Sequence, residues 1–332
     1  MIKNPKQILI LLALIPTICF AQKPKVVSSA SMIWDMAKEI GGEHVEHQLI
    51  VPIGGDPHLY EPTPRDAQMI HDADLIFINA LTFEGWILEL IENSGTKATV
   101  DTVTNGVAAI SSTTYKNSYD PHAWMDIQNG LIYIENIKNA LTKLLPEHGA
   151  TFQKNYEDYK ARLEELDKYI LDRIQEIPKE KRILITSHDA FEYYGKRYGL
   201  KLEAIMGIST EAEAQTSDII RINKTIQSSK VPAVFIESTI NPKLLEQIAK
   251  DNNIVIGGEL YADSIGDEES HAPTYYAMLK HNTDVIVDAL TLKNLPEEAK
   301  QSGPSNLLAY IGVGMLFIIG LLYMILKSNK NA

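Results

Sequence analysis

The stretch Phe152–Ile177, FQKNYEDYKARLEELDKYILDRIQEI, lies near the middle of the chain. Its apolar residues recur three and four positions apart, which predicts a long helix with one narrow apolar stripe. Opposite charges four positions apart, as in Lys154 and Asp158, stabilise its polar face, and Pro178 ends it. Both an ordinary surface helix and a spine that joins two lobes fit this pattern. The stripe consists of Tyr156, Tyr159, Leu163, Leu166, Ile170, Ile174 and Ile177.

The sequence on both sides of this stretch alternates between short apolar runs and amphipathic segments. Such alternation predicts parallel sheets with helical crossovers, and therefore an α/β fold. The predicted strands are 25–27, 48–51, 75–79, 182–186, 233–236 and 254–256. The predicted helices are 31–40, 64–72, 84–92, 127–144, 190–198, 217–228, 242–251 and 274–290.

The composition is that of a globular protein with an acidic surface. Charged residues make up 22% of the 332 residues, and the formal net charge is −12. Nucleic-acid binding needs a basic face, and no cluster of Lys and Arg occurs here. We therefore exclude nucleic acid as a partner.

The N-terminal segment 1–21 has the features of a secretory signal peptide. Two lysines precede an apolar run at 8–20, and the small residue Ala21 follows it. The only cysteine, Cys19, lies inside this segment, and Ile18 stands where a lipoprotein would have a small residue. We therefore expect cleavage after Ala21 without lipidation. The mature chain would contain neither disulfides nor thiolate metal ligands.

The C-terminal segment 307–326, LLAYIGVGMLFIIGLLYMIL, contains no charged residue. About 20 consecutive apolar residues suffice for a helix to cross a bilayer, so we expect a transmembrane helix here. A polar linker precedes it at 293–306, and the tail 327–332 contains Lys327 and Lys330, which favours a cytoplasmic tail. The sequence thus predicts an exported, extracytoplasmic body that a C-terminal helix anchors in the bacterial plasma membrane.

Three histidines lie in stiff loops or at strand ends. His58 and His122 each follow an Asp-Pro dipeptide, and His188 follows the apolar strand predicted at 182–186. In α/β sheets, ligands bind in the loops outside the carboxyl ends of the strands. Proline before two of these histidines restricts the backbone and lowers the entropy cost of assembling a site from distant residues.

A fourth loop of this kind follows the strand predicted at 254–256 and offers two carboxylates, Asp263 and Asp267. Three imidazoles and one carboxylate form a nitrogen and oxygen donor set with a single negative charge. This set suits Zn²⁺, Mn²⁺ or Fe²⁺, whereas Ca²⁺ and Mg²⁺ prefer oxygen ligands alone. The spacing of the residues leaves both aspartates open as the fourth ligand.

Five segments resemble, in the same order, the zinc, manganese and iron substrate-binding proteins of bacterial ABC importers, which are periplasmic solute-binding proteins of the ZnuA/TroA type. The resemblance covers roughly 25–292, nearly the whole predicted body. The segments are GGDPHLYEPTPRDAQMIHDADLIFINALTFEGW, YDPHAWMDIQNG, TSHDAFEYYGKRYGL, GISTEAEAQTSDI and GELYADSIGDEESHAPTYYAMLKHN.

The resemblance implies an α/β fold of two lobes, each a parallel sheet flanked by helices, joined by one long rigid backbone helix. The lobes would be 22–147 and 179–292, and the linking helix would be 148–178. Together with the C-terminal transmembrane helix, this is the fold class that we predict. The resemblance also implies four metal ligands, two from each lobe, and selects Asp263 over Asp267. They are His58 in GDPH, His122 in DPHAW, His188 in TSHDAF and Asp263 in YADSIG.

The same resemblance implies a monomeric binding protein and no enzyme. It would capture zinc or manganese, with iron less favoured, and deliver the ion to a permease driven by a cytoplasmic ATPase. In the family the third ligand is His or Glu, and His188 favours zinc. Many zinc carriers have a histidine-rich loop that the segment 106–119 does not have, so manganese stays open.

Two other functions are compatible with a metal in these loops. An exported zinc metallohydrolase would use three protein ligands and a water, with Glu211 or Glu237 as general base. A surface adhesin would hold the ion as a structural staple. For each of these sites the imidazoles must be neutral to bind the ion, so affinity should fall below about pH 6.

Overall fold

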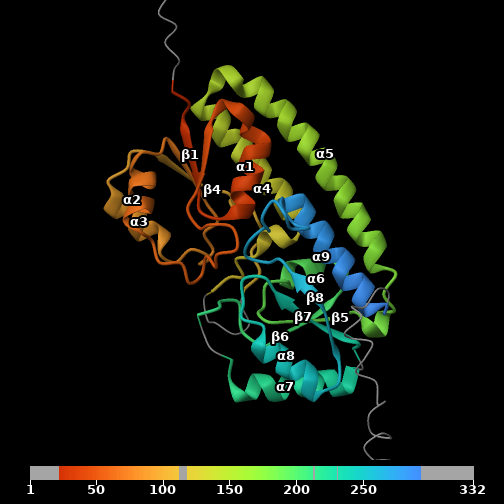
Figure 1. Ribbon diagram of the computed structural model, residues 1–332. Coiled ribbons are helices and arrows are strands. Elements are labelled where there is room, and N and C mark those ends of the chain that lie inside the picture. Colours follow the sequence, from red (N-terminus) through yellow and green to blue (C-terminus); the bar gives the residue numbers. More distant parts are fainter. Residues whose placement is uncertain (1–21, 112–117, 212–213, 230, 293–332) are drawn as a thin grey trace, which may run out of the picture.

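The computed structural model describes residues 22–111, 118–211, 214–229 and 231–292. Figure 1 shows two lobes beside one long helix, α5 (Gly149–Ile174), which runs along both of them. This helix is the striped stretch of the sequence. Of its two interpretations, the spine that joins two lobes is the one that fits.

The N-terminal lobe is built on four parallel strands in the order β2-β1-β3-β4. Its third strand, β3, has the sequence LIFI and is buried along its whole length, as expected for a strand with both faces covered. The strands are β1 (Lys25–Ser28), β2 (Glu46–Leu49), β3 (Leu75–Ile78) and β4 (Thr99–Thr102). The helices are α1 (Ser31–Gly41), α2 (Pro64–His71), α3 (Ile87–Ser94) and α4 (Ile127–Leu144).

The C-terminal lobe contains two parallel strand pairs, β5 with β6 and β7 with β8. Its last helix, α9, packs between this lobe and the spine (Figure 1). The strands are β5 (Ile183–Thr186), β6 (Lys201–Ala204), β7 (Ala233–Glu237) and β8 (Val255–Leu260). The helices are α6 (Glu192–Tyr198), α7 (Thr216–Ser229), α8 (Lys243–Asp251) and α9 (Tyr275–Leu290). Short 3₁₀ turns lie at Gly42–His44, Ala123–Met125, Pro146–His148 and Lys179–Lys181.

Polar contacts fix the spine to both lobes. Near its start, Asn155 donates a hydrogen bond of 2.9 Å to the carbonyl oxygen of Ile40 at the end of α1. In its last third, Asp167 accepts hydrogen bonds from Arg197 and Tyr198 of α6, at 2.7 and 2.9 Å. Because the two sets of partners belong to different lobes, α5 sets the distance between the lobes.

The apolar stripe of α5 lies in the main hydrophobic core, which is continuous through both lobes. Leu163 is fully buried in this core. We expect Leu163→Ala to lower the free energy of unfolding by about 2–5 kcal/mol, because it leaves a cavity in a packed interior. Urea denaturation would measure the loss. Leu171→Ala, on the half-exposed side of the same helix, is the matched control, and equal losses in the two variants would contradict the core assignment.

The predicted fold class needs a correction in its transmembrane part. Within the described stretches of 22–292, no helix is both long and apolar enough to cross a membrane. The longest of them, α5, has charged residues over most of its surface, and burying charges in lipid is costly. The predicted span 307–326 itself lies outside the described residues, as do 1–21, 293–306 and 327–332. The supported fold is the two-lobe α/β architecture alone.

Candidate metal centre

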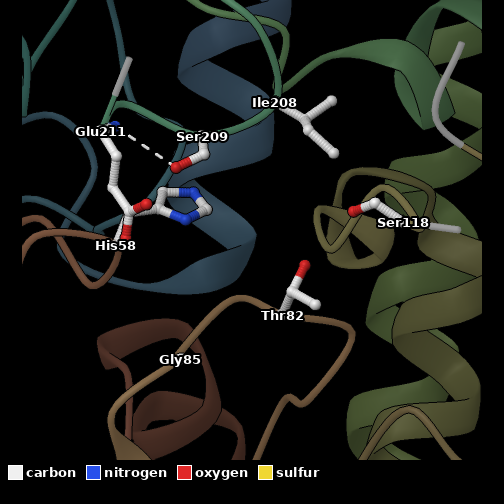
Figure 2. Close-up of a pocket in the computed structure, with 7 residues that line it drawn as sticks. All are labelled: His58, Thr82, Gly85, Ser118, Ile208, Ser209 and Glu211. Atoms are coloured by element: carbon white, nitrogen blue, oxygen red, sulfur yellow. Dashed lines mark hydrogen bonds between the residues drawn. The ribbon is translucent and has the colours of Figure 1, made fainter. Parts of the chain in front are cut away.

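A cavity of about 380 Å³ opens between the two lobes (Figure 2). The imidazole of His58 forms part of its wall, and the side chain is 3% exposed. The cavity therefore gives solvent a route to the edge of His58, whereas His122, His188 and Asp263 are fully buried. Its other lining residues are Thr82, Gly85 and Ser118 from the first lobe and Ile208, Ser209 and Glu211 from the second.

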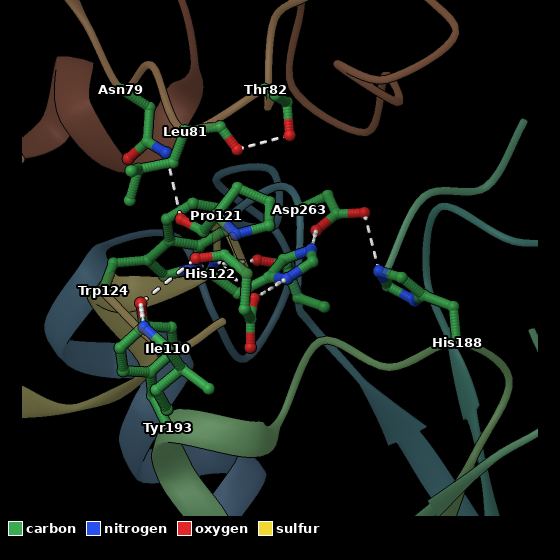
Figure 3. Close-up of polar contacts among 12 residues, drawn as sticks. Asn79, Leu81, Thr82, Ile110, Pro121, His122, Trp124, His188, Tyr193 and Asp263 are labelled. Atoms are coloured by element: carbon green, nitrogen blue, oxygen red, sulfur yellow. Dashed lines mark hydrogen bonds and ion pairs between the residues drawn. The ribbon is translucent and has the colours of Figure 1, made fainter. Parts of the chain in front are cut away.

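Behind His58, four side chains from distant parts of the sequence converge. His58 follows β2, His122 precedes the turn Ala123–Met125, His188 follows β5 and Asp263 follows β8. Each offers one ligand atom, and these atoms all lie within 4.8 Å of one another. Figure 3 shows the carboxylate of Asp263 between the imidazoles of His122 and His188.

The carboxylate of Asp263 is the centre of the cluster and is fully buried. Its Oδ1 lies 3.2 Å from Nε2 of His122, and its Oδ2 lies 3.1 Å from Nε2 of His188. Nε2 of His58 lies 3.9 Å from the same Oδ2. Neither oxygen has a hydrogen bond of standard geometry within the described chain. A buried carboxylate needs positive charge beside it, so these atoms fit a bound cation.

Two further carboxylates orient two of the imidazoles. Oδ1 of Asp120 accepts hydrogen bonds from the backbone N–H and from Nδ1 of His122, at 2.9 and 2.7 Å. Oε1 of Glu237, at the end of β7, accepts the backbone N–H of His188 at 2.8 Å. Its Oε2 forms an ion-pair contact of 2.6 Å with Nδ1 of His188. Both imidazoles thus turn Nε2 toward Asp263, the arrangement that metal-binding histidines adopt.

Aromatic rings pack against two of the imidazoles in the cluster. The ring of Phe83 meets His58 edge-on, with centroids 5.0 Å apart, and packs on Trp124 at 4.7 Å. Trp124 meets His122 at 5.3 Å and donates a hydrogen bond of 3.1 Å to the carbonyl oxygen of Ala262. These rings exclude water from the cluster, and electrostatic interactions are stronger in such a medium.

The close contacts between buried carboxylates and imidazoles shift their pKa values in opposite directions. Burial alone would lower the pKa of His122, but Asp120 and Asp263 raise it to about 9. Burial acts on His188 in the same way, and Glu237 and Asp263 raise its pKa well above the usual value. Burial would raise the pKa of Asp263, but the two imidazoles hold it well below its usual range. The direction of these shifts favours protonated His122 and His188 in the metal-free protein at neutral pH.

Metal binding must displace these protons, which changes the expected pH dependence. Because the pKa of His122 is about 9, affinity should weaken as pH falls from about 9, well above the pH of about 6 expected from ordinary imidazoles. The pKa of His58 is lowered by burial to about 3, so His58 stays neutral over this range. Each displaced proton changes affinity by about tenfold per pH unit.

Calorimetric titration with Zn²⁺ at pH 7, in buffers of different ionisation enthalpy, would count the released protons. We expect more than one proton per ion. If no protons are released and the zinc affinity does not change between pH 6 and pH 8, His122 and His188 are not protonated in the metal-free site.

All four residues predicted as ligands lie in this cluster. Asp267, the alternative that spacing left open, is exposed and accepts the backbone N–H of Glu269 at 3.2 Å instead. The orienting roles of Asp120 and Glu237 were not among the predictions from sequence. The signal for Asp120 was present in the motif, since it is the aspartate of Asp-Pro-His.

The sequence profile described as "zinc-uptake complex component A, periplasmic" matches residues 26–289. The chain is 36% identical over 278 residues to the metal ABC transporter substrate-binding lipoprotein SsaB of Streptococcus sanguinis, covering 81% of this chain and 90% of that protein. It is 35% identical over 267 residues to the manganese-binding lipoprotein MntA of Halalkalibacterium halodurans, covering 80% and 88%.

Solved structures of metal-binding proteins also resemble the fold of this chain. The periplasmic zinc-binding protein TroA from Treponema pallidum superimposes with a TM-score of 0.77 at 34% identity, covering 81% of this chain and 99% of that one. A manganese-bound periplasmic metal-binding protein from Candidatus Liberibacter asiaticus gives a TM-score of 0.75 at 32% identity, covering 81% and 100%.

Proposed function

Because this chain belongs to the family of zinc-uptake complex component A proteins, we propose that it is the substrate-binding protein of a metal ABC importer. It captures a divalent transition metal between its lobes and delivers the ion to a membrane permease. The observation that supports this most strongly is the buried cluster of three imidazoles around one carboxylate.

The proposed ligands are His58 and His122 from the lobe 22–147, and His188 and Asp263 from the lobe 179–292, with 148–178 as the linking helix. Four donors from the protein can surround an ion without a reserved water position. Because each lobe supplies two of them, separation of the lobes removes half of the ligand set. This arrangement suits capture followed by release.

The proposed cargo is zinc or manganese, with iron less favoured. Imidazole donors suit zinc, and a carboxylate that can offer both oxygens also suits manganese. The family supports both, since similar proteins are named for manganese and for zinc. Competition between Zn²⁺ and Mn²⁺ in an equilibrium titration would rank the two ions.

The metallohydrolase alternative is weaker because its candidate bases are poorly placed. Glu237 is held by the backbone N–H and the ring of His188. Glu211 lies on the exposed wall of the cavity. For the adhesin alternative, we find no supporting feature in the described residues.

The proposed partners are a permease and its cytoplasmic ATPase, and the proposed location is outside the cytoplasmic membrane. Relatives named as lipoproteins of metal ABC transporters support the location. Metal titration of the purified protein tests the function. We expect one tightly bound ion per chain and loss of metal uptake in a deletion strain. Absence of stoichiometric binding, or chelator-sensitive hydrolysis, would overturn the proposal.

A further inference from the structure

The two Asp-Pro-His motifs place their aspartates differently. In both, one carboxylate oxygen accepts the backbone N–H of the histidine, at 2.8 Å for Asp56 and 2.9 Å for Asp120. Asp120 also holds the imidazole of His122. Within the described chain, the ring of His58 forms an ion-pair contact only with Asp263. His58 is thus the one proposed ligand whose ring has no orienting carboxylate behind it.

The second oxygen of Asp56 crosses the cleft instead. Oδ2 of Asp56 accepts a hydrogen bond of 2.6 Å from Oγ1 of Thr210, which belongs to the other lobe. Four residues before His58, the backbone N–H of Gly54 donates to Oγ of Ser264, also across the cleft, at 2.8 Å. The loop that holds His58 is therefore attached to the second lobe at two points.

Thr210 belongs to a segment that runs beside the His188 loop. The N–H of Met206 donates to the carbonyl oxygen of Ser187 at 2.9 Å. The N–H of Asp189, the residue after His188, donates to the carbonyl oxygen of Gly207 at 3.2 Å. Three residues later, Thr210 reaches Asp56. The hydroxyl of Thr210 therefore connects the loops of His58 and His188, which belong to opposite lobes.

We propose that Asp56 is a positioning residue that, through Thr210, holds His58 on the metal only while the two lobes are together. This inference rests on the proposed function. When the lobes separate, the hydrogen bond to Thr210 breaks. His58 keeps the backbone bond to Asp56 and the ring contact with Phe83, but its ring has no carboxylate of its own lobe beside it. His122 and His188 keep their carboxylates, which lie close to them in their own lobes. His58 is then the first ligand to leave the ion.

The test compares Thr210→Val with the unaltered full chain by stopped-flow release of Zn²⁺ to a chelator. Loss of an outer hydrogen-bond partner of a metal site typically weakens binding by about 10–100-fold. We expect the weaker binding of Thr210→Val to result from faster dissociation of the ion. The association rate should change little, because in this proposal the ion binds before the lobes close. Thr210→Ser, which keeps the hydroxyl, should restore slow release.

Hydrogen exchange on the zinc-loaded proteins distinguishes positioning from general loosening. In Thr210→Val, amides of residues 54–60 should exchange faster, while those of 119–125, around His122, should not. The matched control is Thr239→Val in the second lobe, because Oγ1 of Thr239 has no hydrogen-bond partner in the described chain. It should release zinc at the unaltered rate.

Three results would overturn the inference. They are unchanged zinc release from Thr210→Val, faster release from Thr239→Val to the same extent, and faster exchange at both histidine loops. If the unaltered chain binds neither Zn²⁺ nor Mn²⁺, the proposed function fails and the inference fails with it; if it binds Mn²⁺ alone, the same release experiment is run with Mn²⁺. If the unaltered chain binds and Thr210→Val behaves like it, the inference alone fails.

Discussion

Replacing Asp263 with asparagine is expected to produce the largest loss of metal affinity, on the order of 10²–10⁴-fold. The change keeps the shape of the side chain and removes the only negative charge among the proposed ligands. Asp263 lies within 3.2 Å of both flanking imidazoles and is fully buried. Water therefore cannot compensate for the lost charge. Competition titration with a chelator of known zinc affinity would measure the effect.

Asp267→Asn is the matched control for this prediction. It makes the same chemical change four residues later in the same loop, at an exposed position. Its zinc affinity should equal that of the unaltered protein. The Asp263 variant should also release fewer protons on binding, because Asp263 helps to raise the pKa of His122 and His188. Equal affinities of the two variants would exclude Asp263 as a ligand.

The spine was the most predictable part of the fold from sequence. A stripe repeated over seven apolar residues, with charges elsewhere, leaves few alternatives to a long amphipathic helix. Its role was less predictable, because a stripe of this width fits a surface helix equally well. The deciding contacts, such as Asn155 with Ile40 and Asp167 with Tyr198, involve polar residues. Apolar periodicity contains no information about them.

Two strands were missed for a related reason. β4 has the sequence TVDT and β6 has KLEA, and both are largely exposed or half-buried. β4 lies at the edge of its sheet, and β6 pairs only with β5 among the described strands. Strands of this kind need little apolar sequence, because a neighbouring strand supplies their hydrogen bonds. An assignment based on apolar runs therefore finds the strands with more apolar sequence and omits these two.

The site was predictable in its residue types but not in its assembly. Loop stiffness and strand ends indicated His58, His122 and His188, yet only the resemblance to a family separated Asp263 from Asp267. The carboxylates that orient the imidazoles were harder still to predict from sequence. Glu237 lies 49 residues after His188 in sequence, and no local pattern links the two. Such contacts depend on how β5 and β7 are placed side by side.

Replacing His58 with alanine is the second prediction with a large effect. We expect zinc affinity to fall by more than about 100-fold, since even outer-shell changes at metal sites cost 10–100-fold. The remaining three ligands keep their geometry, because Asp120 and Glu237 still orient His122 and His188. The variant should therefore bind zinc weakly rather than lose binding altogether. Calorimetry at micromolar protein concentration covers this range.

The His58→Ala variant also distinguishes a metal-binding protein from a zinc hydrolase. His58 lines the cavity, so its removal lets water reach the vacated position and leaves three protein ligands plus water, the usual arrangement of a catalytic zinc site. A binding protein should lose affinity and gain no turnover, because Glu237 remains held by His188. His44→Ala is the control and should bind zinc with unaltered affinity. The ring of His44 stacks on His148 instead, with centroids 3.9 Å apart. Unchanged zinc affinity and stoichiometry in His58→Ala would contradict the ligand assignment, and with it the role inferred for Asp56 and Thr210.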